Sequence, residues 1–393
     1  MRRGAIAVVT VAAASLGAGC TPASGDGSID AGSRGDEFVL AGVRDVTQVA
    51  RLTGPGAVND TDSVAVAGTD LGSMLNVGDR TYFFFGDTFG VRDPDSIGGQ
   101  GENWRSNVVA WTTDAEPADG IAFDGWVVDE WGLAKEIAPG LHEADGFGEV
   151  TKIPTYAFEV EGAIYAFFMS VRHWGDPGVW EANYAGLARS TDDGASWEVL
   201  EEPRWPGDGP FVQVSAAHVR EDGQEYVYLW GIPAGRFGGV SLMRVPANRA
   251  AVENLSQYQY FSGAPDGRPE WSDAPSDAAL VLDRAVGEFS VVHNEFLDRW
   301  LISYMADNQD AVVAEGLSPW GPWGEPFTLT SQAETPGLYA PYLNPRYVAD
   351  GGRTVYFTLS IWGPYSVFWY AADLVARDAT SAAPSGSGGR SSE

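Results

Sequence analysis

The sequence is poor in basic residues and contains almost no cysteine. Of its 393 residues, 24 are Lys or Arg and 54 are Asp or Glu, so the formal net charge is -30. Nucleic acids and anionic lipid surfaces would be repelled by this charge, so we expect neither as a partner. The one cysteine, Cys20, excludes an intramolecular disulfide. The stability of the fold must therefore come from packing, for which an aromatic share of 12% is ample.

The sequence also lacks the motifs of several enzyme classes. Its four histidines are scattered and include no i,i+4 pair of the kind that binds zinc in hydrolases. It has no G-x-S-x-G nucleophile elbow, no phosphate-binding loop and no thiol nucleophile. No segment shows a long helical apolar period, which excludes an α/β barrel. We expect neither a metal nor an organic cofactor.

The beginning of the chain is typical of an export signal. Two arginines precede an apolar stretch over residues 5–16 that is too short to span a bilayer. Small residues then lead to Cys20, which predicts a lipoprotein with signal peptide 1–20, cleaved before Cys20 and lipidated on its sulfur. The alternative is an ordinary secretory peptide that is removed together with Cys20. In both cases we expect an exported protein, secreted or held at the outer face of the cell membrane by that lipid alone.

Composition divides the rest of the chain into three parts. Residues 21–36 and 379–393 consist mostly of small and polar residues, and they are predicted to be a flexible tether and a disordered tail. The folded domain is expected over residues 37–378. We expect this domain to be a monomer.

One strand pattern recurs five times within this domain. A turn rich in Asp or Gly leads into an aromatic or aliphatic strand, and the copies span residues 80–90, 162–175, 224–239, 298–307 and 353–363. A strand-like run precedes each copy and another follows it, and a further strand is expected in the turn-rich stretch between the first two. Such units, at a spacing of roughly sixty to eighty residues, predict an all-β fold, a single five-bladed β-propeller of four-stranded antiparallel blades. A β-sandwich is the alternative. Residues 38–52 are a candidate for the strand that closes the ring.

Two aspartates bracket the first of these hairpins. Asp70 precedes it and Asp87 follows it, each where an apolar run breaks at glycine, so antiparallel strands would bring both carboxylates to one end of a sheet. Glycoside hydrolysis requires two such carboxyl groups in different surroundings. Asp87 follows three phenylalanines, which predicts poor solvation, a raised pKa and the role of general acid. Asp70, beside hydroxyl and backbone donors, suits a nucleophile or base. The two roles could be exchanged, and turn-capping aspartates are the alternative.

Further polar and aromatic residues fall at neighbouring strand ends and are candidates for binding a sugar substrate. They are Arg105, Asn107, Glu149, Arg172, His173, Trp174, Arg236, Glu288 and Trp362. Arg105 is expected to clamp a carboxylate or a hydroxyl, or else to form a structural salt bridge. Glu288 is a third carboxylate and could itself be the general acid. Aromatic residues in the long interruptions at 114–148 and 248–287 either stack on sugar rings or pack into the body.

Several motifs carry a family resemblance. They are residues 82–90 (YFFFGDTFG), 104–114 (WRSNVVAWTTD), 169–175 (MSVRHWG) and 233–239 (PAGRFGG), with 288–305 and 355–368. Over roughly residues 47–374 the chain resembles the bacterial endo-D-arabinanases of glycoside hydrolase family 183, long catalogued as a domain of unknown function. The resemblance implies a propeller hydrolase that cuts internal D-arabinofuranosyl linkages of mycobacterial arabinogalactan and lipoarabinomannan. It also implies that Asp70 and Asp87 are the catalytic acids.

Two other functions stay open. One is a propeller glycosidase of different specificity, acting on L-arabinan or sialic acid, although a sialidase should show several Asp-boxes and only residues 190–197 match one convincingly. The other is a non-catalytic, carbohydrate-binding lipoprotein of the cell envelope. In each case the expected partner is a polysaccharide or its sugar.

Overall fold

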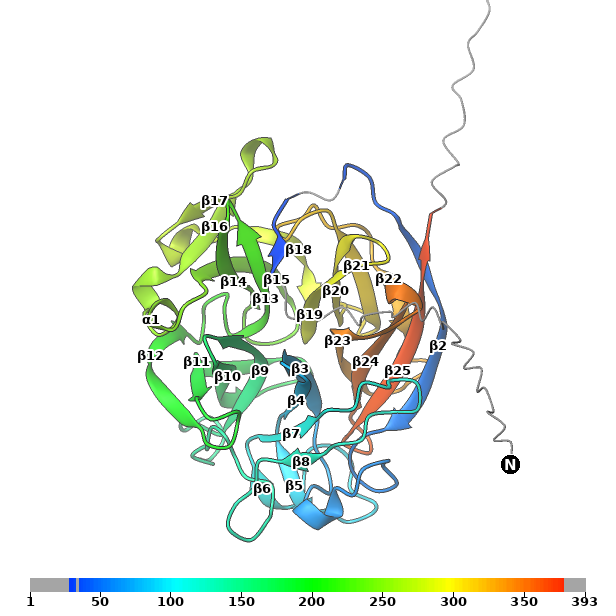
Figure 1. Cartoon of the computed structure of the whole chain (residues 1–393). Helices are drawn as coiled ribbons and strands as arrows, with labels where there is room; N and C mark the ends of the chain where they lie inside the picture. The colour runs from blue at the N-terminus through cyan, green and yellow to red at the C-terminus, as the bar shows by residue number, and fades with distance from the viewer. Residues whose placement is uncertain (1–27, 33–34, 378–393) are drawn as a thin grey trace, which may run out of the picture.

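Large β-sheets stand around a common axis in the computed structural model (Figure 1). The structure describes residues 28–32 and 35–377. The predicted signal peptide, the lipidation site at Cys20 and the predicted tail at 379–393 lie outside the described residues. Within those residues, no helix is long and apolar enough to cross a membrane.

The five recurring segments each form the second strand of a sheet. These strands are β4 (Arg80–Phe85), β10 (Ala163–Trp174), β14 (Gln224–Ile232), β20 (Arg299–Met305) and β24 (Thr354–Ile361). The first strands are β3 (Leu71–Val77), β9 (Thr151–Val160), β13 (Gln213–Glu221), β19 (Phe289–Asn294) and β23 (Leu338–Ala349), and each contacts the next around a closed ring. The third strands are β7 (Val108–Thr112), β11 (Trp180–Ser190), β15 (Gly238–Pro246), β21 (Ala311–Gly316) and β25 (Ser366–Ala376). The chain is thus all-β, with a propeller arrangement.

Local sequence explains the hairpins between first and second strands. Glu161 and Gly162 join β9 to β10, and Asp222 and Gly223 join β13 to β14, all with positive φ. Two-residue turns of this kind match the twist of the strands that they connect. The strands themselves are rich in β-branched and aromatic residues, which favour the extended conformation.

The prediction of five four-stranded blades is wrong, because four sheets in the described part of the chain have that form. Four sheets have four strands, completed by β8 (Gly125–Trp126), β12 (Glu198–Pro206), β22 (Phe327–Thr330) and β2 (Leu40–Arg51). At the third unit stands a seven-stranded sheet instead, because the interruption at 248–287 adds β16 (Gln259–Gly263), β17 (Glu270–Ser272) and β18 (Leu280–Val286), and β1 (Ile29–Asp30) joins it. In three of the four-stranded sheets the fourth strand follows the third along the chain, whereas β2 comes from the N-terminal part of the chain; none lies between the first two strands as expected.

The N-terminal part of the chain is attached to the ring at two places. β2 pairs antiparallel with β25, which confirms that residues 38–52 supply a strand to the last sheet; in Figure 1 the blue β2 runs beside the red β25. Glu315 supports this closure by accepting hydrogen bonds from the backbone of Val39 and Leu40. Within the predicted tether, β1 pairs parallel with β13, so this part is not a free linker.

Aromatic side chains fill the space between the sheets. Trp230 of β14 packs on Trp300 of β20 with ring centroids 5.5 Å apart, and both are fully buried. Burying a large apolar side chain stabilises the fold by about 1.5–3 kcal/mol. Tyr258 and Tyr260 are also buried, and Trp271 packs edge-on against Tyr228. These aromatic residues of the 248–287 interruption therefore belong to the body and do not form an exposed stacking surface.

The remaining regular elements are short. A two-stranded sheet joins β5 (Thr88–Val91) to β6 (Glu102–Arg105), and α1 covers Arg249–Val252. Five 3-10 turns span Asp62–Val64, Leu255–Gln257, Pro265–Gly267, Pro275–Asp277 and Asp350–Gly352. The Asp-box forms the turn between β11 and β12, where Asp192 accepts from the backbone and the hydroxyl of Ser196.

Candidate active site

The two aspartates lie at the same end of the β3–β4 hairpin. Asp70 directly precedes β3 and Asp87 follows β4, and Leu71 is paired with Phe85 across the hairpin. We call this end of the ring, at which the first strands begin and the second strands end, the site face. The sequence prediction that both carboxylates reach one end of a sheet agrees with this register.

The backbone beside Asp70 is in an unusual conformation. Leu71 has φ 65° and Gly72 has φ 89°, and the pairing of β3 with β4 shifts between Leu71 and Ser73. A residue other than glycine persists in the left-handed region only where its surroundings hold it, and such residues cluster at functional sites. Here the hydroxyl of Ser360 accepts the Leu71 N–H at 2.8 Å. The bulge directs Asp70 against the last sheet.

The carboxyl group of Asp70 has few hydrogen-bond partners. The hydroxyl of Tyr339 donates to Oδ2 at 2.9 Å, whereas Oδ1 is buried and has no hydrogen-bond partner among the described residues. A Cβ added to Gly86 would lie 2.4 Å from this Oδ1, so the carboxyl group needs glycine there. Burial, and then the charge of Asp87, raise the pKa of Asp70 to about 8, although the hydroxyl groups of Tyr339 and Tyr365 oppose the rise.

Asp87 has better hydrogen bonding. The indole N–H of Trp104 and the hydroxyl of Thr151 donate to its Oδ1 at 2.7 and 2.6 Å. Burial raises the pKa of Asp87 to about 6, and these two donors and the nearby His142 oppose the rise. The expected assignment of environments is therefore reversed, and Asp87 is the better hydrogen-bonded acid. The reason is that the rings of Phe83, Phe84 and Phe85 are wholly buried in the core.

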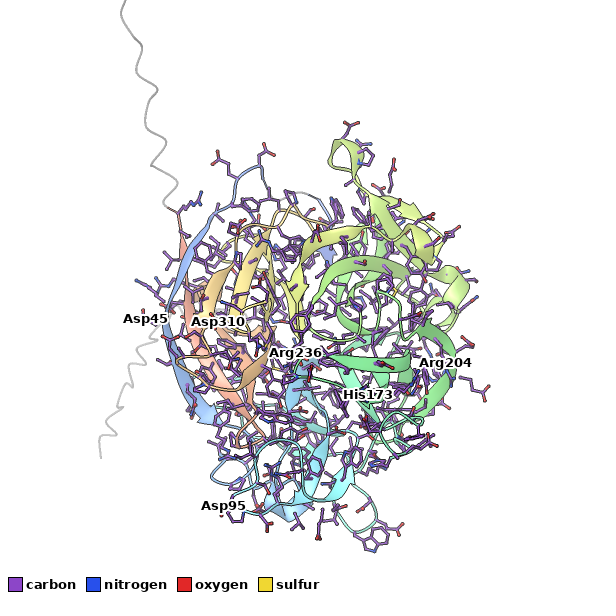
Figure 2. All side chains as sticks on the ribbon, turned by 180° about the vertical axis from the view of Figure 1, so that it is seen from behind. Asp45, Asp95, His173, Arg204, Arg236 and Asp310 are labelled. Atoms are coloured by element: carbon purple, nitrogen blue, oxygen red, sulfur yellow. The ribbon has the colours of Figure 1, made fainter. Side chains whose placement is uncertain are left out.

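Glu288 forms an ion pair with Arg236. Arg236 lies between β14 and β15 and Glu288 directly precedes β19; the guanidinium Nε lies 3.0 and 2.9 Å from the two carboxylate oxygens, and its Nη2 donates at 2.6 Å. Figure 2 shows Arg236 close to the centre of the ring. Because both oxygens of Glu288 accept from this cation, Glu288 is poorly suited to deliver a proton.

Two pairs of aromatic rings lie beside Arg236. Its guanidinium lies 5.3 Å from the ring centroid of Tyr339, and the ring of Tyr339 lies 6.5 Å from that of Trp362. The same guanidinium lies 5.7 Å from the ring centroid of Trp180, and the ring of Trp180 lies 5.7 Å from that of Trp174. Of these side chains, Trp362 and Trp174 are accessible to solvent and are 50% and 39% exposed. We call these five side chains the aromatic platform.

Three predicted binding residues have structural roles instead. Arg105 donates to the carbonyl groups of Ala134 and Ala65 and forms no clamp on a carboxylate. The amide of Asn107 makes four hydrogen bonds to the backbone of residues 137, 138 and 152. Glu149 is buried and paired with Lys152. These polar side chains bond mainly to the backbone and to side chains around the loop that leads into β9, although Nε of Arg105 is buried and has no hydrogen-bond partner among the described residues.

Two predicted residues lie farther out on the site face. Arg172 is half-exposed and faces Glu181 at 3.7 Å. The Nδ1 of His173 lies 2.6 Å from the carboxylate of Asp145, and Figure 2 shows His173 outward from Arg236. Neither side chain contacts the aspartate pair, although both adjoin Trp174 in the chain.

Sequence reasoning missed Tyr339, Thr151 and Trp104. One signal could have found the first two: Asp70, Thr151, Glu288 and Tyr339 all stand at or next to the start of a first strand. Equivalent positions of this kind meet near the axis of a propeller. Trp104 gives no such signal, because β6 lies outside the repeating units.

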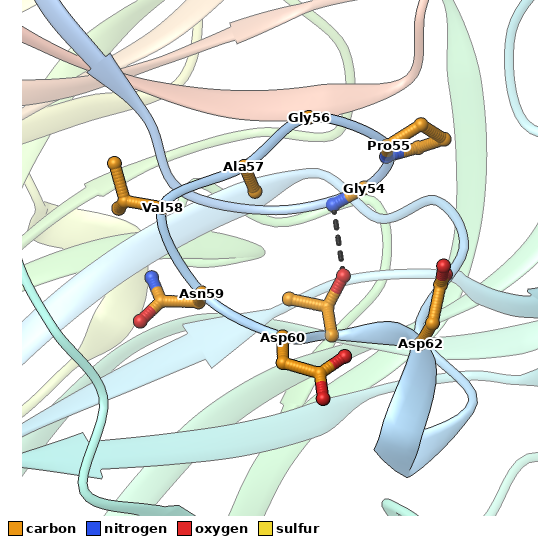
Figure 3. A pocket seen from close by; sticks show the side chains of 9 residues that line it. Gly54, Pro55, Gly56, Ala57, Val58, Asn59, Asp60 and Asp62 are labelled. Atoms are coloured by element: carbon orange, nitrogen blue, oxygen red, sulfur yellow. Dashed lines mark hydrogen bonds between the residues drawn. The ribbon is translucent and has the colours of Figure 1, made fainter.

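Other parts of the structure offer little to a ligand. Among residues 28–32 and 35–377, no three His, Cys, Asp or Glu side chains are grouped as metal ligands. A cavity of about 340 Å³ is formed by the loop 54–62, which is closed by a hydrogen bond from the Gly54 N–H to the Thr61 hydroxyl (Figure 3). Its lining contains neither Asp70 nor Asp87.

Comparison with known proteins finds a matching family model, a sequence relative and solved structures of similar fold. The family model of DUF4185, a domain of unknown function, matches residues 56–371. Notoamide biosynthesis cluster protein J' of Aspergillus versicolor is 27% identical over 310 residues, which are 76% of this chain and 81% of the relative. A candidate hydrolase of Bacteroides ovatus has a similar structure, with a TM-score of 0.53 and 14% identity over 79% of this chain and 86% of that one. An exo-β-1,3-galactanase of Phanerochaete chrysosporium has a TM-score of 0.47 and 10% identity over 86% and 65% of the chains.

Proposed function

This chain belongs to the DUF4185 family, and from the carboxyl pair on its site face we propose that it is a glycoside hydrolase. We propose further that it cleaves internal D-arabinofuranosyl linkages of an arabinan, with Asp70 and Asp87 as its catalytic residues. The observation that carries the proposal is that different surroundings give two neighbouring carboxyl groups different pKa values. Near neutral pH, a pKa of about 8 keeps Asp70 protonated and a pKa of about 6 keeps Asp87 ionised.

The two protonation states define two roles. Asp70 donates its proton to the glycosidic oxygen as the bond from that oxygen to the anomeric carbon breaks. On the inverting route Asp87 takes a proton from the water that attacks the anomeric carbon. On the retaining route Asp87 attacks that carbon itself, and water then cleaves the resulting ester while Asp70 takes the proton of that water. The first route inverts the anomeric configuration and the second retains it, so the configuration of the first product distinguishes them.

The aromatic platform supports action within a polymer. Its solvent-exposed rings, Trp362 and Trp174, pack on Tyr339 and Trp180, the two rings nearest to Arg236. We propose that a glycan chain stacks on both exposed rings, one on each side of the reacting bond, which an enzyme that cleaves only chain ends would not need. The net charge of -30 supports a neutral polymer as the substrate. The resemblance to the endo-D-arabinanases adds the D-arabinan specificity.

The test is cleavage of mycobacterial arabinogalactan by the protein and by two variants, Asp70→Asn and Asp87→Asn. We expect soluble oligo-arabinosides of several lengths from the wild type and a loss of about 10²–10⁴-fold in rate for each variant. The matched control is Asp95→Asn, because Asp95 is exposed and lies at the edge of the molecule (Figure 2). Equal rates for either catalytic variant would remove that aspartate from the mechanism. Binding without cleavage by the wild type would identify a carbohydrate-binding module, and cleavage of L-arabinan or sialosides alone would replace the substrate.

A further inference from the structure

Tyr339 reaches Asp70 from the last sheet, which adjoins the first sheet in the closed ring. It is the second residue of β23 in the last sheet and is 4% exposed, and its hydroxyl donates to Oδ2 of Asp70 at 2.9 Å. The two residues are 269 positions apart in the chain. The hydrogen bond therefore joins the first and last sheets beside the carboxyl pair.

The backbone on both sides of this hydrogen bond is constrained. Ala340, directly after Tyr339, has φ 56°, just as Leu71, directly after Asp70, has φ 65°. The pairing of β23 with β24 is also irregular between Tyr339 and Tyr342. A left-handed residue other than glycine costs of order 1–3 kcal/mol and persists only where the surroundings enforce it. Two such residues at one contact indicate that the fold is built to bring this hydroxyl to this carboxyl group.

The ring of Tyr339 is also held by a charge. The guanidinium of Arg236 lies 5.3 Å from the ring centroid, and the two-point ion pair with Glu288 keeps that guanidinium in place. A cation over an aromatic face is attracted to the ring, and its positive charge strengthens the phenol as a donor. Burial keeps the pKa of Tyr339 well above its ordinary value, with Arg236 opposing the rise. The hydroxyl thus stays protonated and able to donate.

We propose that Tyr339 is a positioning residue of the site, whose hydroxyl orients the carboxyl group of Asp70 and stabilises its charged form. Arg236 and Glu288 act through Tyr339 by fixing its ring. The role of Asp70 in turnover rests on the proposed function, whereas the action of Tyr339 on Asp70 does not. The other titratable or charged groups that face Asp70 are Asp87, Glu288, Arg236, Tyr342 and Tyr365.

The substitution Tyr339→Phe tests this proposal, because it keeps the ring and removes only the donor. The measurement is the pH titration of the Asp70 carboxyl carbon by NMR of the full chain labelled with ¹³C-aspartate. A hydrogen bond to a charged group corresponds to a shift of about one to two pH units, so the Asp70 midpoint should rise by about that amount. The matched control is Tyr342→Phe on the same strand, which lies near Asp70 without a hydrogen bond to it among the described residues and should leave the midpoint unchanged.

A second variant covers the case in which Tyr339→Phe does not fold. Incorporation of 3-fluorotyrosine at position 339 preserves the shape of the side chain and makes the phenol a stronger donor, so the midpoint should fall. An Asp70 midpoint that moves in neither variant, or moves equally in Tyr342→Phe, would overturn the proposal.

The pH dependence of kcat/KM distinguishes a failure of this proposal from a failure of the proposed function on which it partly rests. If the wild type cleaves arabinogalactan, the alkaline limb of kcat/KM should move upward in Tyr339→Phe together with the Asp70 midpoint. A shifted midpoint in a protein that cleaves no glycan would refute the proposed function and leave the role of Tyr339 intact. Cleavage with an unmoved alkaline limb and an unmoved midpoint would refute the role of Tyr339 alone.

Discussion

Replacing Thr151 by valine removes one of the two side-chain donors that hold the charge on Asp87. The Thr151 hydroxyl donates to Oδ1 at 2.6 Å from the first residue of β9, and valine has nearly the same shape. A hydrogen bond to a charged group contributes about 1.5–3 kcal/mol. Since one pH unit corresponds to about 1.4 kcal/mol, the pKa of Asp87 should rise by roughly one to two units.

The direction of the effect follows from the roles of the two acids. Under the proposed function, activity needs Asp87 ionised and Asp70 protonated. We therefore expect kcat/KM for arabinogalactan to fall at pH values below the Asp87 pKa of about 6 and at pH values above the Asp70 pKa of about 8. In Thr151→Val the acid limb should move toward the alkaline limb, and the plateau should narrow or vanish. The two limbs report the coupled pair, so both should be fitted together.

The assay is the release of reducing ends measured over about pH 4–10. The control is Thr354→Val, because the Thr354 hydroxyl donates to Asp373 at the same 2.6 Å but on the outer part of the last sheet. It should leave both limbs in place. An unchanged acid limb in Thr151→Val, or movement of the alkaline limb alone, would refute the assignment of Asp87 as the ionised partner.

Two further variants test the geometry around this pair. Gly86→Ala places a Cβ 2.4 Å from Oδ1 of Asp70; the carboxyl group must then move by about 1 Å, and kcat should fall by about 100-fold with little change in melting temperature. Full activity in this variant would contradict the placement of Asp70. Arg236→Met leaves Glu288 buried without its cation, so the free energy of unfolding measured with urea should fall by about 3 kcal/mol. The double variant Arg236→Met/Glu288→Leu should recover most of that loss, and a double variant as unstable as the single one would show that the ion pair is not the cause.

The sequence predicted the strands of this protein better than the residues of its site. The recurring aromatic segments became the second strands because alternation and turn residues act locally, within one hairpin. Asp70 and Asp87 share one hairpin, so their meeting could be predicted in the same way. Tyr339 and Thr151 come from other sheets, and no local pattern relates them to Asp70 and Asp87. The number of regular blades was overestimated because β16 and β17 lie in an interruption whose pairing is not periodic.

Amino-acid order alone was sufficient for the all-β propeller arrangement, the closure by β2 and the placement of two carboxyl groups at one end of a hairpin. The strands and hairpins depend on side-chain alternation and on turn residues, both of which are visible in a single segment. The closing strand could be predicted because residues 38–52 are a strand-like run that precedes the first of the five units. Which of the two aspartates has the higher pKa depended instead on the assembled ring. The phenylalanines before Asp87 turn into the core, Trp104 and Thr151 donate to Asp87, and Oδ1 of Asp70 is enclosed against Gly86. Solvation and hydrogen bonding set a carboxyl pKa, and both are properties of the surroundings in space rather than of neighbours in the chain.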